Sequence, residues 1–306
     1  MSKIAIVGDV HIASNVSSRV DDYFNTCLNK IKEISEENDS IIFLGDLFNT
    51  PTIQNNYFVE LYNLFTYYKN KGKKFYSIIG NHDIYNEREE SLYKSTLGLC
   101  EITGLIEIIK PNMPISIGKY NFHTTYVNFN KAKEHIKTLK LNENDILLLH
   151  HFFDDQYEGF TYEDIKDIGC KNIFLGHEHS PFPELRKVYK EFTAYRSGSL
   201  LRNSSIQYNL ERDIFYFVIE NNEVKCCRLE STKLAKDIFT QQAYSQENLS
   251  KKIFLQNIND VIGKYTNNIS TQNKFSISCI LTELNTPISS LNYIKSKYES
   301  IGERFE

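Results

Sequence analysis

The sequence predicts an α/β protein with two β-sheets between two layers of helices, followed by a small α+β domain at the C-terminus. Strand, helix, strand, helix and strand alternate over residues 3–83, which is typical of a mainly parallel sheet covered by helices. Further strands predicted between residues 192 and 229 indicate a second sheet. Near residue 231 the pattern changes and a separate helix-strand-helix unit follows. We therefore expect a main domain over residues 1–235 and a small capping domain over residues 236–306.

Short runs rich in isoleucine, leucine, valine and aromatic residues predict the strands. In chain order these are residues 3–8, 40–45, 75–79, 105–109, 115–117, 119–125, 146–150, 172–176, 192–197, 213–219 and 224–229. The last three are expected to form a second, more antiparallel sheet.

Apolar residues at helical spacing predict helices over residues 19–37 and 53–69. The first has acidic residues in its first turn, including Asp22, and Pro51 suits the start of the second. Shorter helices are predicted near residues 90–98 and 130–139 and after Thr161. In the C-terminal domain the expected elements are helix 248–265, strand 274–283 and a helix that begins at Thr286 and Pro287.

Composition limits the classes of protein that fit this chain. Its 306 residues, 41% of them hydrophobic, suit a globular protein. The formal net charge of −4 provides no global basic field for nucleic acid, so any such contact would be local. Six cysteines without a CxxC motif indicate reduced thiols. No apolar run reaches ~18 residues and the chain opens with a strand, so we expect a cytoplasmic protein without a membrane partner.

Five of the predicted strands are followed by Asp, His or Asn, which are residue types that commonly bind metals. The segments are Gly8-Asp9-Val10-His11, Gly45-Asp46, Gly80-Asn81-His82-Asp83, His150-His151 and Gly176-His177-Glu178-His179. Any one of them could be an ordinary turn, because Gly-Asp is a common turn pair. Five together favour a site, since the carboxyl ends of strands in α/β sheets are where ligands bind.

These segments supply more ligands than one metal ion needs. The candidate ligands are Asp9, His11, Asp46, Asn81, His150, His177 and His179. They suit two divalent metals that share a carboxylate, and mixed imidazole and oxygen donors favour Mn²⁺, Fe or Zn²⁺ over Mg²⁺. No cysteine belongs to the set, which argues against a structural zinc site.

A pair of metals about 3.5–4 Å apart polarises a phosphoryl group and activates a water, which predicts phosphoester hydrolysis without a covalent intermediate. His82 is not needed as a ligand. It can protonate the leaving oxygen or stabilise charge on phosphorus, a role worth roughly 10²–10⁴ in rate. Asp83 is expected to orient the His82 ring.

Taken in this order, the motifs over residues 3 to about 200 resemble the calcineurin-like metallophosphoesterase superfamily. The resemblance implies that one metal is held by Asp9, His11, Asp46 and His179. It implies that the other is held by Asp46, Asn81, His150 and His177, and that His82 is catalytic. We assign the ligand role to His150, which abuts the strand, and a supporting role to His151.

Within the superfamily, three features resemble the SbcD-type (Mre-eleven-type) DNA repair nucleases and their phage counterparts. Asp9-Val10-His11 lies within the first residues of the chain, and Gly45-Asp46-Leu47-Phe48 is the form that those nucleases carry. Arg196-Ser197-Gly198-Ser199-Leu200 resembles their Pro-Gly-Ser segment and is followed by a small capping domain. The likeness implies a Mn²⁺-dependent DNA exonuclease or endonuclease, a homodimer, and an SbcC-type ATPase partner. Asn49 departs from the family pattern, where Asp or His is common, and so does His151, where Gln is common.

Two other functions fit the same residues less well. A small-molecule phosphodiesterase or phosphatase on this scaffold is favoured slightly by the negative net charge. A scaffold that has lost catalysis is disfavoured, because the ligand set is complete.

Overall fold

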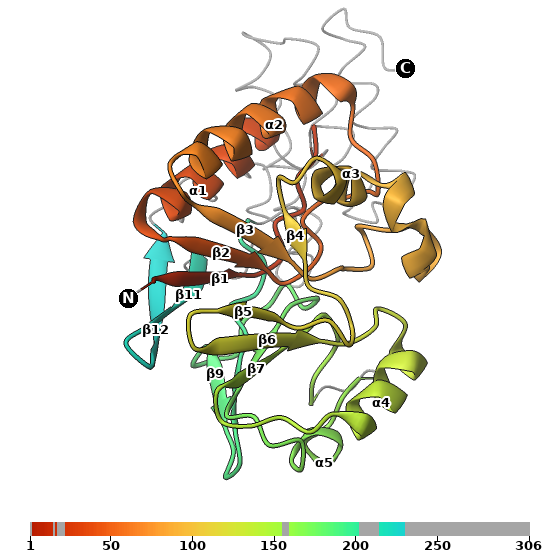
Figure 1. Cartoon of the computed structure of the whole chain (residues 1–306), viewed down its shortest axis with the longest axis vertical. Coiled ribbons are helices and arrows are strands. Elements are labelled where there is room, and N and C mark those ends of the chain that lie inside the picture. Colours follow the sequence, from red (N-terminus) through yellow and green to blue (C-terminus); the bar gives the residue numbers. More distant parts are fainter. Residues whose placement is uncertain (1, 15, 17–21, 155–158, 202–213, 230–306) are drawn as a thin grey trace, which may run out of the picture. The chain divides into compact units, whose positions relative to one another are not determined.

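The computed structural model describes residues 2–14, 16, 22–154, 159–201 and 214–229. All helices and strands reported below belong to one compact unit, which comprises Met1–Asn15, Asp22–Arg202 and Arg212–Thr232. The predicted capping domain, residues 236–306, lies outside the described residues, and its extent stays a prediction. Within the described unit, two six-stranded sheets pack face to face (Figure 1).

The first sheet is mixed. Its strand order is β12 (Glu223–Leu229), β11 (Ile214–Glu220), β1 (Ile4–Val7), β2 (Ser40–Phe43), β3 (Lys74–Ser77) and β4 (Glu107–Ile108). Strands β1 to β4 are parallel to one another, with Ala5 opposite Ile41 and Ile41 opposite Phe75. Their carboxyl ends therefore reach the same edge of the sheet.

Strands β11 and β12 correct one expectation from the sequence, which placed them in the second sheet. They extend the first sheet instead, because β11 pairs antiparallel with β1 and aligns Ile4 with Ile219. This pairing covers an edge of β1 that would otherwise expose unpaired backbone groups. It also buries Phe217 and Ile219 in the core between the sheets.

The second sheet has the strand order β5 (Ile115–Ile117), β6 (Tyr120–Thr124), β7 (Asp145–Leu149), β8 (Asn172–Leu175), β10 (Thr193–Tyr195) and β9 (Arg186–Val188). Strands β6, β7, β8 and β10 are parallel, which makes this sheet less antiparallel than expected. The sequence did not predict β9, because Arg186, Lys187 and Val188 form no apolar run.

Helices cover the outer face of each sheet (Figure 1). α1 (Tyr23–Glu37) and α2 (Asn55–Asn70) lie on the first sheet, and α4 (Phe129–Thr138) and α5 (Tyr162–Ile165) lie on the second. The 3-10 helices η1 (Tyr85–Glu87) and η2 (Glu89–Lys94) lead into α3 (Thr96–Ile102). The predicted four-layer α/β sandwich is therefore confirmed.

The helix ends differ in detail from the sequence prediction. Asp22 is the N-cap of α1 rather than part of its first turn, and its side chain accepts a hydrogen bond from the Asn25 amide. The N-cap of α2 is Gln54, so Pro51 lies three residues before the cap and outside the helix. The helix predicted near residues 90–98 is interrupted at Ser95, whose hydroxyl caps α3 by accepting from the Gly98 amide.

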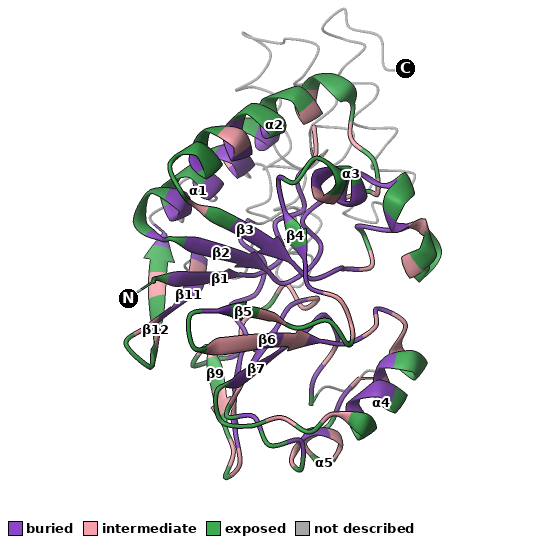
Figure 2. Ribbon diagram, viewed as in Figure 1, coloured by how far each residue is buried: buried purple, intermediate pink, exposed green. Residues whose placement is uncertain are grey.

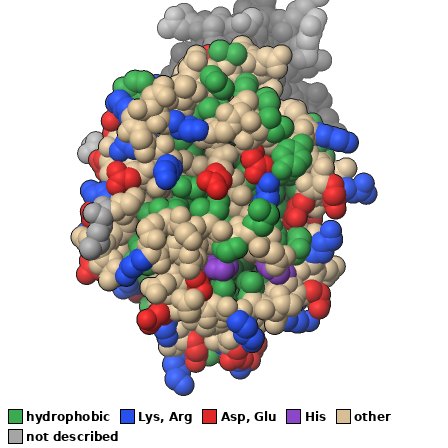
Figure 3. All heavy atoms as spheres, viewed as in Figure 1, with side chains coloured by type: hydrophobic (Ala, Val, Ile, Leu, Met, Phe, Trp, Pro, Cys, Tyr) green, Lys and Arg blue, Asp and Glu red, His purple; other side chains and the backbone are tan. Residues whose placement is uncertain are grey.

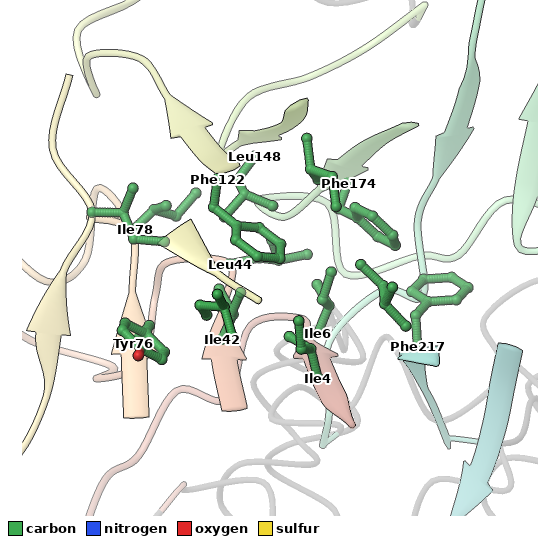
Figure 4. Packing of buried hydrophobic residues seen from close by; sticks show 14 of the residues in the cluster. Ile4, Ile6, Ile42, Leu44, Tyr76, Ile78, Phe122, Leu148, Phe174 and Phe217 are labelled. Atoms are coloured by element: carbon green, nitrogen blue, oxygen red, sulfur yellow. The ribbon is translucent and has the colours of Figure 1, made fainter. Parts of the chain in front are cut away.

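The main core lies between the two sheets. Side chains of a strand alternate between its two faces, so Ile4 and Ile6 of β1 point into this core together with Ile42. From the opposite sheet, Phe122 and Phe174 pack against them (Figure 4). A separate cluster behind the second sheet joins Leu147, Leu149, Ile173 and Leu175 to residues of α4 and α5. β1, β2 and β7 are accordingly buried along their whole length. The edge strands β9 and β12 are largely exposed, as are the outer sides of the helices (Figure 2).

Over the described residues, no helix combines the length and the apolar character that crossing a bilayer requires.

The core predicts a contrast between two isoleucines. Ile42 is fully buried between the sheets, whereas the side chain of Ile102 on α3 is 65% exposed. Ile42→Ala should lower the free energy of unfolding by roughly 2–5 kcal/mol because it leaves a cavity. Ile102→Ala should change it by less than about 0.5 kcal/mol. Urea unfolding of both variants measures the difference, and equal losses would contradict this assignment of the core.

Candidate metal centre

The carboxyl ends of β1, β2 and β3 meet those of β7 and β8, and the predicted ligands gather there. Among the residues that the structure describes, three groups of side chains could each hold a metal ion, with ligand atoms within 4.8 Å of one another. They are Asp9, His11 and His179; Asp46, His150 and His177; and His11, Asp46 and His82. Asn81 contacts the second group through its amide oxygen.

The backbone at these strand ends adopts unusual conformations. His11, Asp46 and His177 have φ angles of 54°, 47° and 75°, in the left-handed region that non-glycine residues seldom occupy. Such residues cost of order 1–3 kcal/mol each and persist only where the surrounding structure holds them. Gly80 is required because a Cβ atom there would lie 2.1 Å from the Asp46 amide nitrogen. Strain and close packing thus concentrate at this site.

The group formed by Asp9, His11 and His179 has the character of a cation site. The Nε2 atoms of His11 and His179 lie 2.8 Å apart, and His179 Nε2 is 3.7 Å from Asp9 Oδ2. Asp9 is 1% exposed, and its Oδ2 atom has no hydrogen-bond partner among the described residues. A buried carboxylate oxygen facing two ring nitrogens fits a bound divalent metal, which would satisfy all three atoms.

In the second group, both imidazole rings contact the Asn81 amide oxygen. That oxygen lies 3.1 Å from His150 Nε2 and 3.1 Å from His177 Nδ1. His150 Nε2 is also 3.2 Å from Asp46 Oδ2. Two imidazoles, an amide oxygen and a carboxylate are donors that Mn²⁺, Fe or Zn²⁺ accepts.

Asp46 lies between the two groups. Its Oδ2 atom is 3.2 Å from His150 Nε2 and 3.7 Å from His11 Nε2. Its Oδ1 atom accepts a hydrogen bond of 2.8 Å from the His82 amide. These distances suit a carboxylate shared by two metals, as the sequence predicts.

Burial sets the protonation of three of the candidate ligands, Asp9, His11 and His177. It raises the pKa of Asp9 to about 7, against an opposing effect of the His150 charge. It lowers the pKa of His11 to about 3 and that of His177 to about 3. Both rings are therefore neutral at pH 7, which is the form that binds metals.

His150 and Asp46 form a buried pair with opposite shifts. Burial by itself lowers the pKa of His150, but the charge and hydrogen bond of Asp46 outweigh it and raise the pKa to about 10. Burial likewise opposes ionisation of Asp46, yet His150 holds the pKa of that carboxyl below its ordinary value. A metal between them would replace the His150 proton.

Backbone carbonyls orient two of the imidazole rings. His150 Nδ1 donates to the Leu44 carbonyl at 2.7 Å, which directs Nε2 toward Asp46. His82 Nδ1 donates to the Asn49 carbonyl at 2.9 Å, and its side chain is exposed. Fixing the tautomer through the second ring nitrogen is the usual way in which proteins prepare histidine ligands.

Asp83 has a different role from the one expected. Instead of orienting the His82 ring, its buried carboxylate accepts from the amides of Phe48 and Gly80 at 3.0 and 2.9 Å. It thereby joins the turns after β2 and β3. His151 contacts the Tyr126 carbonyl at 2.8 Å through Nε2, and the structure places His150 rather than His151 in a candidate metal group.

Sequence reasoning missed the groups that support the ligands. The carbonyls of Leu44 and Asn49 carry no sequence signal, because every residue has a carbonyl. The pairing of Arg196 with Glu178 was also missed, although a charged residue between two histidines was a usable hint. The ligand roles themselves remain predictions that metal binding must test.

Comparisons with known proteins agree with this geometry. Residues 2–181 match the family model of the calcineurin-like phosphoesterases, and the chain belongs to that family. With the histidine and aspartate groups, this defines a metal-dependent phosphoester hydrolase.

Solved structures that are similar to the chain include two crystal structures. One is the crystal structure of a hypothetical protein from Thermus thermophilus, 11% identical, with a TM-score of 0.42 over 74% of this chain and 98% of the other. A second crystal structure gives the same identity, TM-score and coverage. The search of curated proteins gave no match.

The shared position of Asp46 predicts that Asp46→Asn loses both metals, because the amide removes a charge from each group. Metal analysis of protein equilibrated with Mn²⁺ should show two ions per chain in the wild type and none in the variant. Asp167→Asn, at an exposed site, is the matched control and should keep both. Two ions retained by Asp46→Asn would refute the bridging role.

The raised pKa values of Asp9, about 7, and His150, about 10, predict that Mn²⁺ binding strengthens as pH rises. Both groups hold a proton at about pH 6 that the metal must displace, and the proton on Asp9 is lost by about pH 8. Affinity should therefore increase by roughly tenfold or more over this interval. Calorimetric titration in buffers of different ionisation enthalpy measures affinity and proton release. An affinity that falls with pH would contradict the assignment.

Proposed function

We propose that this protein is a dinuclear-metal phosphodiesterase that cleaves DNA in a Mn²⁺-dependent reaction. The observation that carries the phosphodiesterase part is the position of Asp46 between two groups of metal-binding side chains. The choice of DNA rests on the three sequence features that resemble SbcD-type nucleases. The same likeness supports a homodimer that works with an SbcC-type ATPase subunit.

Most of the site residues would hold the metals, and His82 would transfer a proton. When bound, two divalent ions would polarise the phosphoryl group and lower the pKa of the attacking water. Asp9, His11 and His179 would hold one ion, and Asn81, His150 and His177 the other. The exposed His82 ring, fixed by the Asn49 carbonyl, can donate a proton from Nε2 to the leaving oxygen.

The Gly45-Asp46-Leu47-Phe48 segment supports the proposal through its packing. Leu47 and Phe48 are fully buried, so this apolar half of the segment anchors the turn that carries Asp46. The Phe48 amide donates to Asp83, which ties the turn to the His82 segment. The segment typical of the nucleases thus stabilises the geometry of the site and leaves DNA contact to other residues.

The lysines of α4 do not form a free basic surface. Lys131, Lys133 and Lys137 lie 3.9, 3.5 and 2.7 Å from Glu90, Asp164 and Glu134, respectively. On the face shown in Figure 3, Lys and Arg side chains are interspersed with Asp and Glu, and histidines reach the surface between them. DNA binding would then depend on the metals and on local phosphate contacts.

A small-molecule phosphodiesterase or phosphatase is the second candidate. The net charge of −4 and the paired lysines of α4 favour it, because neither attracts a polyanion.

His82→Ser should keep both metals but lower the turnover of bis-p-nitrophenyl phosphate by roughly 10²–10⁴. The reason is that His82 contributes a proton rather than an indispensable ligand. His123→Ser is the matched control, since His123 is a partly buried histidine of β6, 3.5 Å from Asp145, outside the candidate groups. Wild-type turnover in His82→Ser would exclude the proton-transfer role.

The choice of substrate is tested by assaying the full chain with Mn²⁺ on linear duplex DNA, single-stranded DNA and bis-p-nitrophenyl phosphate. We expect cleavage of DNA that is abolished by EDTA and by Asp46→Asn. DNA binding should weaken steeply with salt, because phosphate contacts dominate it. Hydrolysis of the small diester without DNA cleavage would favour the second candidate.

A further inference from the structure

Arg196 is a buried cation beside the turn that carries His177 and His179. It is 6% exposed, and its Nη1 atom donates to the carboxylate of Glu178, the residue between the two histidines. Its guanidinium lies over the ring of Phe182, 4.0 Å from the ring centre. Phe182 is 1% exposed and belongs to the core behind the second sheet, so Arg196 is held from two sides.

The turn that Arg196 contacts needs external support. His177 has a φ of 75°, a conformation that persists only when its surroundings enforce it. One restraint is the hydrogen bond of 3.0 Å from the His177 amide to Asp9 Oδ1. The Glu178 side chain supplies a second restraint, because its partner is fixed by the core.

The segment after Arg196 contacts the same region through its backbone. The Ser199 amide donates to the His179 carbonyl at 3.2 Å, and the Leu200 amide donates to the Asp9 carbonyl at 2.8 Å. Gly8 packs so closely on this segment that a Cβ atom there would lie 2.2 Å from the Gly198 carbonyl oxygen. Residues 196–200 therefore support the candidate ligands that follow β1 and those that follow β8.

Stability alone does not explain this ion pair. Removing two charges from water costs about as much as their attraction returns, so a buried pair contributes little net stability. An ion pair between an arginine and a carboxylate does fix how the two side chains are oriented, because the guanidinium is planar and its N–H groups point in fixed directions. Groups that orient metal ligands in this way typically change metal affinity by roughly 10–100-fold when they are removed.

We propose that Arg196 is a positioning residue which, through Glu178, holds His177 and His179 in the orientation that binds the metals. The proposal rests on the metal centre of the proposed function. It assigns a role in that centre to two residues outside the candidate ligand groups. It also gives a reason for the glutamate between the two histidines.

The test measures metal affinity and stability separately. Variants Arg196→Met, Arg196→Lys and Glu178→Gln of the full chain are titrated with Mn²⁺ alone by calorimetry, and their unfolding in urea is followed by circular dichroism. Arg186→Met, at an exposed position of β9, is the matched control. Both temperature and pH are held constant across the series.

We expect Arg196→Met and Glu178→Gln to bind Mn²⁺ roughly 10–100-fold more weakly while still folded. The Mn²⁺ affinity of Arg196→Lys should lie between those of Arg196→Met and the wild type, because lysine keeps the charge but lacks the planar guanidinium. The double variant Arg196→Met/Glu178→Gln should bind Mn²⁺ no more weakly than whichever single variant binds it more weakly. The reason is that both changes act through the same contact. Arg186→Met should bind as the wild type does.

Wild-type Mn²⁺ affinity in folded Glu178→Gln and Arg196→Met would overturn the proposal, whatever their stability. If Arg196→Met does not fold, Glu178→Gln decides the question alone, because that change keeps size and shape. A wild-type protein that binds no Mn²⁺ would instead overturn the proposed function, and the positioning role with it. The wild-type and variant titrations therefore separate the two failures.

Discussion

The placement of Asp46 is the constraint on which the rest of the site depends. Its backbone carbonyl accepts hydrogen bonds from the amides of Val10 and His11, which fixes the turn after β1. Its side chain accepts from the His82 amide after β3 and faces His150 at the end of β7. Asp46 by itself thus contacts the turns that follow β1 and β3 in its own sheet and the end of β7 in the opposite sheet.

This placement has an energetic cost that the fold offsets. Asp46 is 2% exposed and has a left-handed φ of 47°, so both its charge and its backbone are unfavourable in isolation. The buried His150 compensates the charge, and tight packing of Gly80 against the Asp46 amide keeps the conformation. Two sheets with a shared apolar core supply the rigidity that holds these groups in place. A site with this arrangement is prepared for cations before they bind.

The sequence predicted the strands that carry the site because they are short apolar runs, most of which are followed by a glycine and a polar residue, as at Gly45 and Asp46. It could not predict that β11 pairs with β1, since an apolar strand fits either sheet equally well. Nor could it find the Asn49 carbonyl behind His82, because backbone atoms are the same in every residue. Asp83 was assigned to the wrong partner for a related reason: adjacency in sequence favoured the His82 ring, whereas the turn directs the carboxylate to the amides of Phe48 and Gly80. The gathering of these side chains was therefore predictable, and their backbone supports were not.

Anomalous X-ray diffraction from crystals of the full chain soaked in Mn²⁺ tests the central claim most directly. The account predicts two peaks about 3.5–4 Å apart, with the carboxylate of Asp46 in contact with both. One peak should lie at Asp9, His11 and His179, and the other at Asn81, His150 and His177. A single peak, or two peaks of which one does not touch Asp46, would contradict a dinuclear centre organised by this carboxylate.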